Sequence, residues 1–207
     1  MIVEKLKTKF NFNEPIFTNE ILEMFDNYSY AYVFRLLKQE VENNEIVNFD
    51  KGVYFIPSNT IFGQSTITAE DVVKKKYIND DKSIYGLYSG LSLQNMFALT
   101  TQMPNIIEIV SNNESMRCRK ITIDGRCFIL RKSRCEINND NVSEYTILQL
   151  LSEIKKIDEI DENSRRLIYK YIEESKIKLD TLIELSKFFP SKTTKNLIYS
   201  GVLNEIA

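Results

Sequence analysis

The stretch SYAYVFRLLKQEVENNEIVNFDKGVYFIP, residues 29–57, decides the fold of the N-terminal part of the chain. Ser29 is a candidate N-cap, because its hydroxyl oxygen can accept a hydrogen bond from a free backbone N–H group at a helix start. A long helix is predicted to follow and to end near Asn43. Its apolar residues at helical spacing, which are expected to face the core, are Val33, Phe34, Leu37 and Val41. The residues of its opposite face are Ala31, Arg35, Lys38, Gln39 and Glu42.

The second half of this stretch predicts a β-hairpin. Two β-rich runs, 45–49 and 53–56, flank the loop Asp50-Lys51-Gly52. A short loop that contains glycine between two such runs is typical of a hairpin. Pro57 then ends the second strand, because proline has no N–H group to donate to a ladder.

Two shorter helices are predicted upstream. Residues 2–10 carry an apolar stripe, Pro15 breaks the chain, and Thr18 is the predicted N-cap of a helix over 19–25. Three helices followed by a hairpin predict a winged helix-turn-helix domain over residues 1–58. In a helix-turn-helix domain the second helix of the pair lies in the major groove of DNA. DNA binding is therefore expected, and the alternative is a winged helix that docks another protein.

The rest of the chain, 59–207, is expected to form a second domain of mixed α/β character, which makes the fold class α+β. Strands are predicted in the region 84–137, where Asp124-Gly125 between two β-rich runs is a strong hairpin signal. Residues 142–207 show helical periodicity and are predicted to form a helical tail, with Ser191 as an N-cap after Pro190.

A further helix is predicted over residues 69–77, with Thr68 as its N-cap. It ends in the run Lys74-Lys75-Lys76. These cations either complement the helix dipole at the C-terminus or contact a phosphate group.

The distribution of charge matters more than the net charge of −2. Residues 1–58 contain six Lys/Arg and nine Asp/Glu, a net charge of −3, whereas residues 117–134 contain seven Lys/Arg and one Asp, a net charge of +6. Six of these seven basic residues are expected to be displayed around the predicted hairpin ribbon; they are Arg117, Arg119, Arg126, Arg131, Lys132 and Arg134. Such a ribbon is either a nucleic-acid surface or a sheet edge that its charge keeps soluble.

Several reaction classes are excluded by composition. The chain has no histidine, so neither a Ser-His-Asp triad nor a Cys-His pair can activate a nucleophile. The three cysteines, Cys118, Cys127 and Cys135, lack the close paired spacing of a structural zinc site. The segment Gly86–Gly90 has neither the central serine of a nucleophile elbow nor the Gly-Lys-Ser/Thr end of a phosphate-binding loop. We therefore expect no catalytic residue, no metal and no cofactor, and hence no enzyme.

The compartment is expected to be the cytoplasm. The apolar runs are short and broken by charge, so no segment is long enough to span a membrane, and the first residues show no secretory signal. Free cysteines fit a reducing compartment.

Five short segments of the chain resemble one known family. YGLYSGLSLQN (residues 85–95) and LTTQMPN (99–105) resemble the central motif of the AbiEi-like antitoxins, of the two-gene AbiE toxin–antitoxin systems of abortive phage infection. KGVY (51–54), LDTLIELS (179–186) and FPS (189–191) match the same family in the same order. The resemblance spans nearly the whole chain, and the central motif is its most specific part.

The resemblance implies an antitoxin whose N-terminal winged helix represses its own operon by binding operator DNA. The C-terminal body would counteract a nucleotidyltransferase-like toxin, and in this family neutralisation is usually described as type IV, without a stable complex. The positions that the resemblance assigns to DNA reading are Ser29, Tyr30, Tyr32, Arg35, Lys38 and Gln39, with Lys51 at the wing tip. The net negative charge of residues 1–58 is the opposite of the positive charge that favours operator binding. The competing interpretations are a protein-interaction module and, third, an enzyme that acts on nucleic acid.

The same central motif also has a purely structural interpretation. Its leucines have the spacing of core residues, and its glycines are expected to allow close approach of the backbone.

Overall fold

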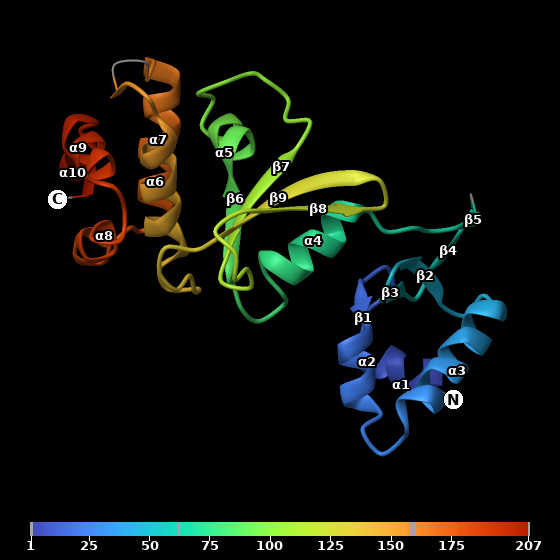
Figure 1. Ribbon diagram of the computed structural model, residues 1–207. Helices are drawn as coiled ribbons and strands as arrows, with labels where there is room; N and C mark the ends of the chain where they lie inside the picture. Colours follow the sequence, from blue (N-terminus) through green and yellow to red (C-terminus); the bar gives the residue numbers. More distant parts are fainter. Residues whose placement is uncertain (1, 62, 158–159, 207) are drawn as a thin grey trace. The chain divides into compact units, whose positions relative to one another are not determined.

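The computed structural model describes residues 2–61, 63–157 and 160–206 (Figure 1). The chain is a mixture of helices and short strands, which confirms the α+β class. It forms two compact units: Met1–Lys75 with Ile123–Gly125, and Lys76–Thr122 with Arg126–Ala207.

The first unit contains the predicted winged helix. Its helices are α1 (Ile2–Lys9), α2 (Thr18–Met24) and α3 (Tyr30–Glu42), and its strands are β1 (Ile16–Phe17), β2 (Val47–Asp50) and β3 (Val53–Phe55). The strands form an antiparallel sheet in the order β1-β3-β2. The three helices bury a common core that includes Leu6, Ile21 and Leu37.

Ser29 caps α3 as predicted, since its side chain accepts a hydrogen bond from the N–H group of Tyr32. The prediction for Thr18 was wrong. Phe17 holds the N-cap position of α2, and the hydroxyl of Thr18 donates instead to the carbonyl oxygen of Gly52, 3.1 Å away. Gly52 has a φ of +76°, which a glycine adopts without strain. Thr18 thereby ties the start of α2 to the turn of the wing.

The first unit continues past residue 58, so the predicted domain boundary lies inside it. Strands β4 (Asn59–Thr60) and β5 (Gly63–Gln64) form a small hairpin, and α4 (Ala69–Tyr77) follows. Val72 of α4 belongs to a buried cluster with Val53 and Phe55 of the wing. This apolar contact holds the start of α4 to the winged helix.

Thr68 caps α4 as predicted. Its hydroxyl accepts from the N–H group of Asp71, and the Asp71 carboxylate accepts from the Thr68 N–H group in return. The two bonds satisfy two backbone donors at the helix start.

The second unit is built on a mixed sheet in the order β6-β7-β9-β8. Its strands are β6 (Gly86–Ser89), β7 (Ile107–Ser111), β8 (Arg119–Ile123) and β9 (Arg126–Lys132), and the short helix α5 (Gly90–Met96) follows β6. β6 and β7 are antiparallel, whereas β7 and β9 are parallel. The predicted hairpin is confirmed, with both Asp124 and Gly125 at positive φ, as a two-residue type I′ turn requires.

The C-terminal helices are α6 (Val142–Glu153), α7 (Glu162–Ser175), α8 (Leu179–Ser186), α9 (Ser191–Tyr199) and α10 (Val202–Ile206). The run from Glu144 to Leu151 on α6 is buried on every side, because α6 contacts β6 and α5 as well as α7, α8 and α9 (Figure 1). The helical tail was therefore predicted correctly. The prediction of Ser191 as an N-cap was wrong, since Pro190 holds the N-cap position of α9.

Candidate nucleic-acid interface

The outer face of α3 is accessible. Most residues assigned to DNA reading are exposed on it or beside it: Ser29, Tyr30, Arg35, Lys38 and Gln39. Tyr32 is partly buried, and Lys51 is exposed in the turn of the wing. The structure thus brings six of the seven positions together at one helix and places Lys51 at the tip of the hairpin.

The guanidinium group of Arg35 lies over the ring of Tyr32, 5.0 Å from its centroid. The Tyr32 ring in turn stacks on Tyr28, with 5.3 Å between the centroids. A cation above an aromatic face is electrostatically stabilised and loses part of its rotational freedom. The guanidinium of Arg35 therefore has a partner on its own helix before any ligand arrives.

Phe34 was predicted to lie in the core, and that prediction was wrong. Its side chain is 45% exposed, whereas those of Val33 and Leu37 are fully buried. Each helical residue is rotated by about 100° from the one before it, and Phe34 therefore lies beside the buried stripe. It follows Tyr30, which is 68% exposed, by one helical turn. Tyr30 and Phe34 are four residues apart and so lie on the same side of the helix, and this spacing was the signal in the sequence that could have indicated their exposure.

The outer face of α3 is basic from Tyr30 to Gln39, although the module as a whole is acidic, and the exposed Glu42 in its last turn lies 3.9 Å from Lys38. Residues 28–39 include Arg35 and Lys38 and no Asp or Glu. Two acidic residues of the module, Glu14 and Glu20, are paired with Lys75 of α4, at 2.8 and 3.2 Å. Part of the negative charge of residues 1–58 is therefore offset by a cation outside that window.

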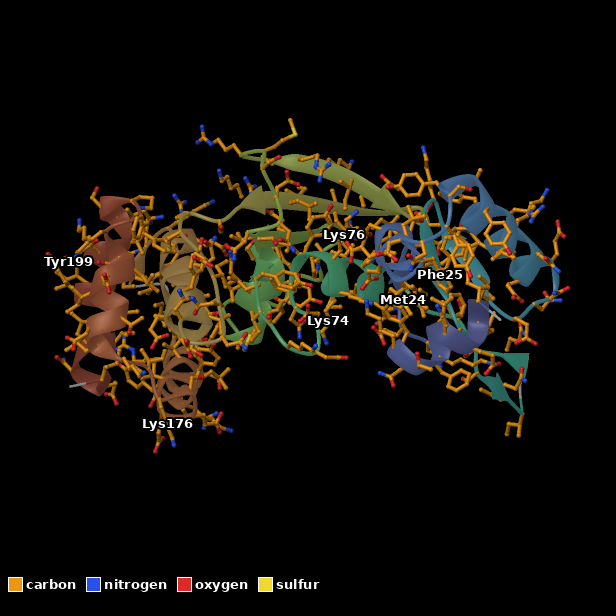
Figure 2. All side chains as sticks on the ribbon, turned by 90° about the horizontal axis from the view of Figure 1, so that it is seen from below. Met24, Phe25, Lys74, Lys76, Lys176 and Tyr199 are labelled. Carbon is orange, nitrogen blue, oxygen red and sulfur yellow. The ribbon has the colours of Figure 1, made fainter. Side chains whose placement is uncertain are left out.

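The lysines of the run 74–76 have different environments. Lys75 is largely buried and forms ion pairs with Glu14 and Glu20. The sequence predicted for this run either a helix-dipole role or a phosphate contact, and neither includes these pairs. Lys74 and Lys76 are exposed and extend from opposite sides of α4 (Figure 2). The run therefore does not act as one cationic patch.

The basic ribbon of the second unit is also divided. Arg119 pairs with the buried carboxylate of Glu114 at 2.8 Å, and Arg131 pairs with Glu108 at 2.9 Å. The remaining cations of the ribbon are exposed; they are Arg117, Arg126, Lys132 and Arg134. Two of the six ribbon residues thus take part in internal ion pairs.

Burial alone would raise the pKa of Glu114, but hydrogen bonds from the Met116 N–H group and from Arg119 outweigh it and hold the pKa below its ordinary value. The guanidinium of Arg119 also donates to the hydroxyl of Tyr77, 3.2 Å away. Glu114 is therefore a buried carboxylate that depends on Arg119.

The central motif, residues 85–95, is partly buried in the second unit, with Gly86, Leu87, Ser89 and Leu93 buried and the others half-buried. A Cβ at Gly86 would lie 2.0 Å from the carbonyl oxygen of Tyr77, so the backbone approaches this closely only because glycine is present. The N–H group of Gly90 donates to the carboxyl of Glu153, at 2.9 Å. Burial raises the pKa of Glu153 above its ordinary value. The close approach that the glycines predicted is confirmed at Gly86.

Among the described residues, no group of three or more His, Cys, Asp or Glu side chains is placed to hold a metal ion. The thiols of Cys118, Cys127 and Cys135 are all free. Within the same part of the chain, no helix combines the length and the apolar character needed to cross a lipid bilayer.

Comparison with protein-family models and with curated proteins gives no match for this chain. The resemblance to AbiEi-like antitoxins therefore rests on the motifs quoted above. The geometry of α3 and the wing is the independent basis for assigning a function.

Proposed function

We propose that this protein is a DNA-binding transcriptional regulator that places α3 in the major groove and the β2–β3 wing on the phosphate backbone. The observation that carries this proposal is the outer face of α3, which is accessible and carries Arg35 and Lys38 with no acidic side chain from residue 28 to residue 39. Phosphate contacts supply affinity and base-edge contacts supply specificity. Arg35 suits a guanine edge, and Lys51 suits a phosphate.

The wider role that we propose is that of an antitoxin that represses its own operon in the cytoplasm and counteracts a nucleotidyltransferase-like toxin. This part rests on the resemblance of residues 85–95 and 99–105 to the AbiEi-like family. In this proposal the second unit has no catalytic function.

A gel-shift experiment with the full chain and the DNA directly upstream of its gene tests the DNA-binding proposal. We expect a specific shift that weakens between about 50 and 200 mM salt, because bound phosphates release counterions. Arg35→Ala is expected to weaken binding by about 5- to 100-fold, the cost of one base contact. Lys51→Ala is expected to reduce the salt dependence by about one counterion.

Arg165→Ala is the matched control, because Arg165 is an exposed arginine on α7 of the second unit. It should bind like the wild type. If the wild-type chain gives no specific shift at any salt concentration, the regulator proposal is wrong.

The exposed aromatic pair on α3 favours a second candidate, a protein-interaction module that does not bind DNA. Tyr30 and Phe34 present an apolar surface of the kind found at protein interfaces. Co-purification with the product of the neighbouring gene, together with no DNA affinity, would favour this candidate. Rescue of growth when both genes are expressed together tests the antitoxin role separately.

A further inference from the structure

We propose that α3 recognises A·T base pairs by covering the methyl groups of thymine with the exposed ring of Phe34 and the neighbouring apolar atoms of Tyr30 and Ala31. This inference rests on the proposed function, because it names the kind of DNA that the same face would select.

Two rows of side chains run along the exposed face of α3. Residues four apart are neighbours on a helix. Tyr30 and Phe34 therefore form one row, and Ala31, Arg35 and Gln39 form the row beside it. All five are exposed. The first row continues into Lys38, so the face carries two apolar rings followed by a cation, next to a row that ends in two hydrogen-bond donors.

This pairing of rows matches what an A·T pair displays in the major groove. Adenine offers N7 and N6, which suit a glutamine, and thymine offers O4 and a methyl group, which suits an apolar side chain. Gln39 can serve the adenine edge while Phe34 covers a thymine methyl group. A G·C pair has no methyl group in the major groove and gives Phe34 no apolar contact.

The exposed apolar surface of α3 supports the same conclusion. The exposed part of residues 28–39 has only Arg35 and Lys38 for charge-based contacts, and Lys38 lies 3.9 Å from Glu42. In contrast, Tyr30 and Phe34 leave much of their apolar surface in water, at 68% and 45% exposure. Burying apolar surface is favourable at roughly 25 cal/mol per Å², so contact of these rings with DNA would add to the affinity.

The experiment compares two versions of the DNA directly upstream of the gene, one amplified with thymine and one with uracil in its place. Uracil pairs like thymine but lacks the methyl group. We expect the wild-type chain to bind the uracil version more weakly, by about fourfold for each methyl group that α3 covers. A large excess of unrelated DNA keeps the comparison to specific binding.

The Phe34→Ala variant should lose most of this discrimination, so that the ratio of the two affinities approaches one. Phe34→Leu, which keeps an apolar side chain, should retain part of it. Phe12→Ala is the matched control, since Phe12 is 57% exposed in the same unit but lies outside α3. It should discriminate like the wild type. Tyr30→Ala provides a second variant if Phe34→Ala does not fold, as judged by circular dichroism.

The outcomes separate this inference from the proposed function. Specific binding to both DNA versions with equal affinity overturns the role of thymine methyl groups and leaves the regulator proposal intact. No specific binding to either version overturns both. Discrimination that survives in Phe34→Ala and Tyr30→Ala also overturns the inference, because the methyl groups would then be read by other residues.

Discussion

The ammonium group of Lys75 lies 2.8 Å from Oε1 of Glu14. It also donates to the carbonyl oxygen of Pro15 at 2.6 Å, and it lies 4.7 Å from the centroid of the Phe10 ring. The side chain of Lys75 is only 14% exposed, so this one cation compensates carboxylates that are themselves largely withdrawn from water. It joins α4 to the segment between α1 and α2.

Replacing Lys75 with alanine is expected to destabilise the first unit by about 2 kcal/mol, because it leaves partly buried carboxylates without their cation. The measurement is urea unfolding of the full chain, followed by a signal from the first unit. Lys74→Ala is the control, since Lys74 is exposed on the same helix, and it should change the stability by less than about 0.5 kcal/mol. Equal effects of the two variants would contradict the role assigned to Lys75.

Arg119→Ala is expected to destabilise the second unit by about 2 kcal/mol, because the carboxylate of Glu114 is buried and would lose its ion pair. Arg117→Ala, at an exposed position two residues away, should be close to neutral. The two variants are compared by thermal unfolding at neutral pH. A larger loss for Arg117→Ala would show that the ribbon is not organised around the Arg119–Glu114 pair.

Glu153→Gln is expected to stabilise the protein increasingly as the pH rises. Burial raises the pKa of Glu153, so the folded state holds its proton more tightly than the unfolded chain. The free energy of unfolding of the wild type therefore falls as the pH rises from the unfolded pKa through the folded pKa. Glutamine does not titrate, and its amide oxygen can still accept from the Gly90 N–H group.

This difference is measured as the unfolding midpoint of both proteins between about pH 4 and pH 8. Glu173→Gln, at an exposed position on α7, is the control and should follow the wild type. A constant difference between Glu153→Gln and the wild type over the whole range would mean that Glu153 does not titrate with folding.

Gly86→Ala is expected to prevent the second unit from folding normally. The added Cβ would lie 2.0 Å from the carbonyl oxygen of Tyr77 and 2.7 Å from that of Val110, and both obstacles are backbone atoms that cannot rotate away.

Ala98→Gly is the opposite case, because Ala98 has a φ of +53° and glycine adopts this conformation more readily. It should raise the stability by up to about 1 kcal/mol. Circular dichroism and thermal unfolding measure both changes.

Local signals in the sequence predicted much of this fold. Ser29 and Thr68 marked helix starts because a hydroxyl one step before a helix can serve free backbone N–H groups. Asp124-Gly125 marked a hairpin because both turn residues must adopt positive φ. The same reasoning was wrong for Thr18, whose hydroxyl instead bonds to Gly52, far along the chain.

The missed features depend on contacts between distant residues. Nothing in the local pattern indicates that β9 pairs in parallel with β7, with Ile107 opposite Phe128. The pairing of Lys75 with Glu14 likewise joins elements that are separate in the sequence. At the candidate site, the exposed polar residues of α3 were predicted correctly from their spacing. Phe34 was not, because spacing alone does not distinguish an apolar residue of the core stripe from one that lies beside it.

The position of β9 between β7 and β8 sets an order of assembly for the second unit. β8 and β9 are joined by a tight turn, whereas β9 meets β7 across a long separation in sequence. Local pairs form sooner than distant ones. We therefore expect the hairpin to form first and to dock along β7 later, and until it docks Phe128 and Leu130, both buried in the folded chain, would be exposed to chaperones, proteases and other unfinished chains.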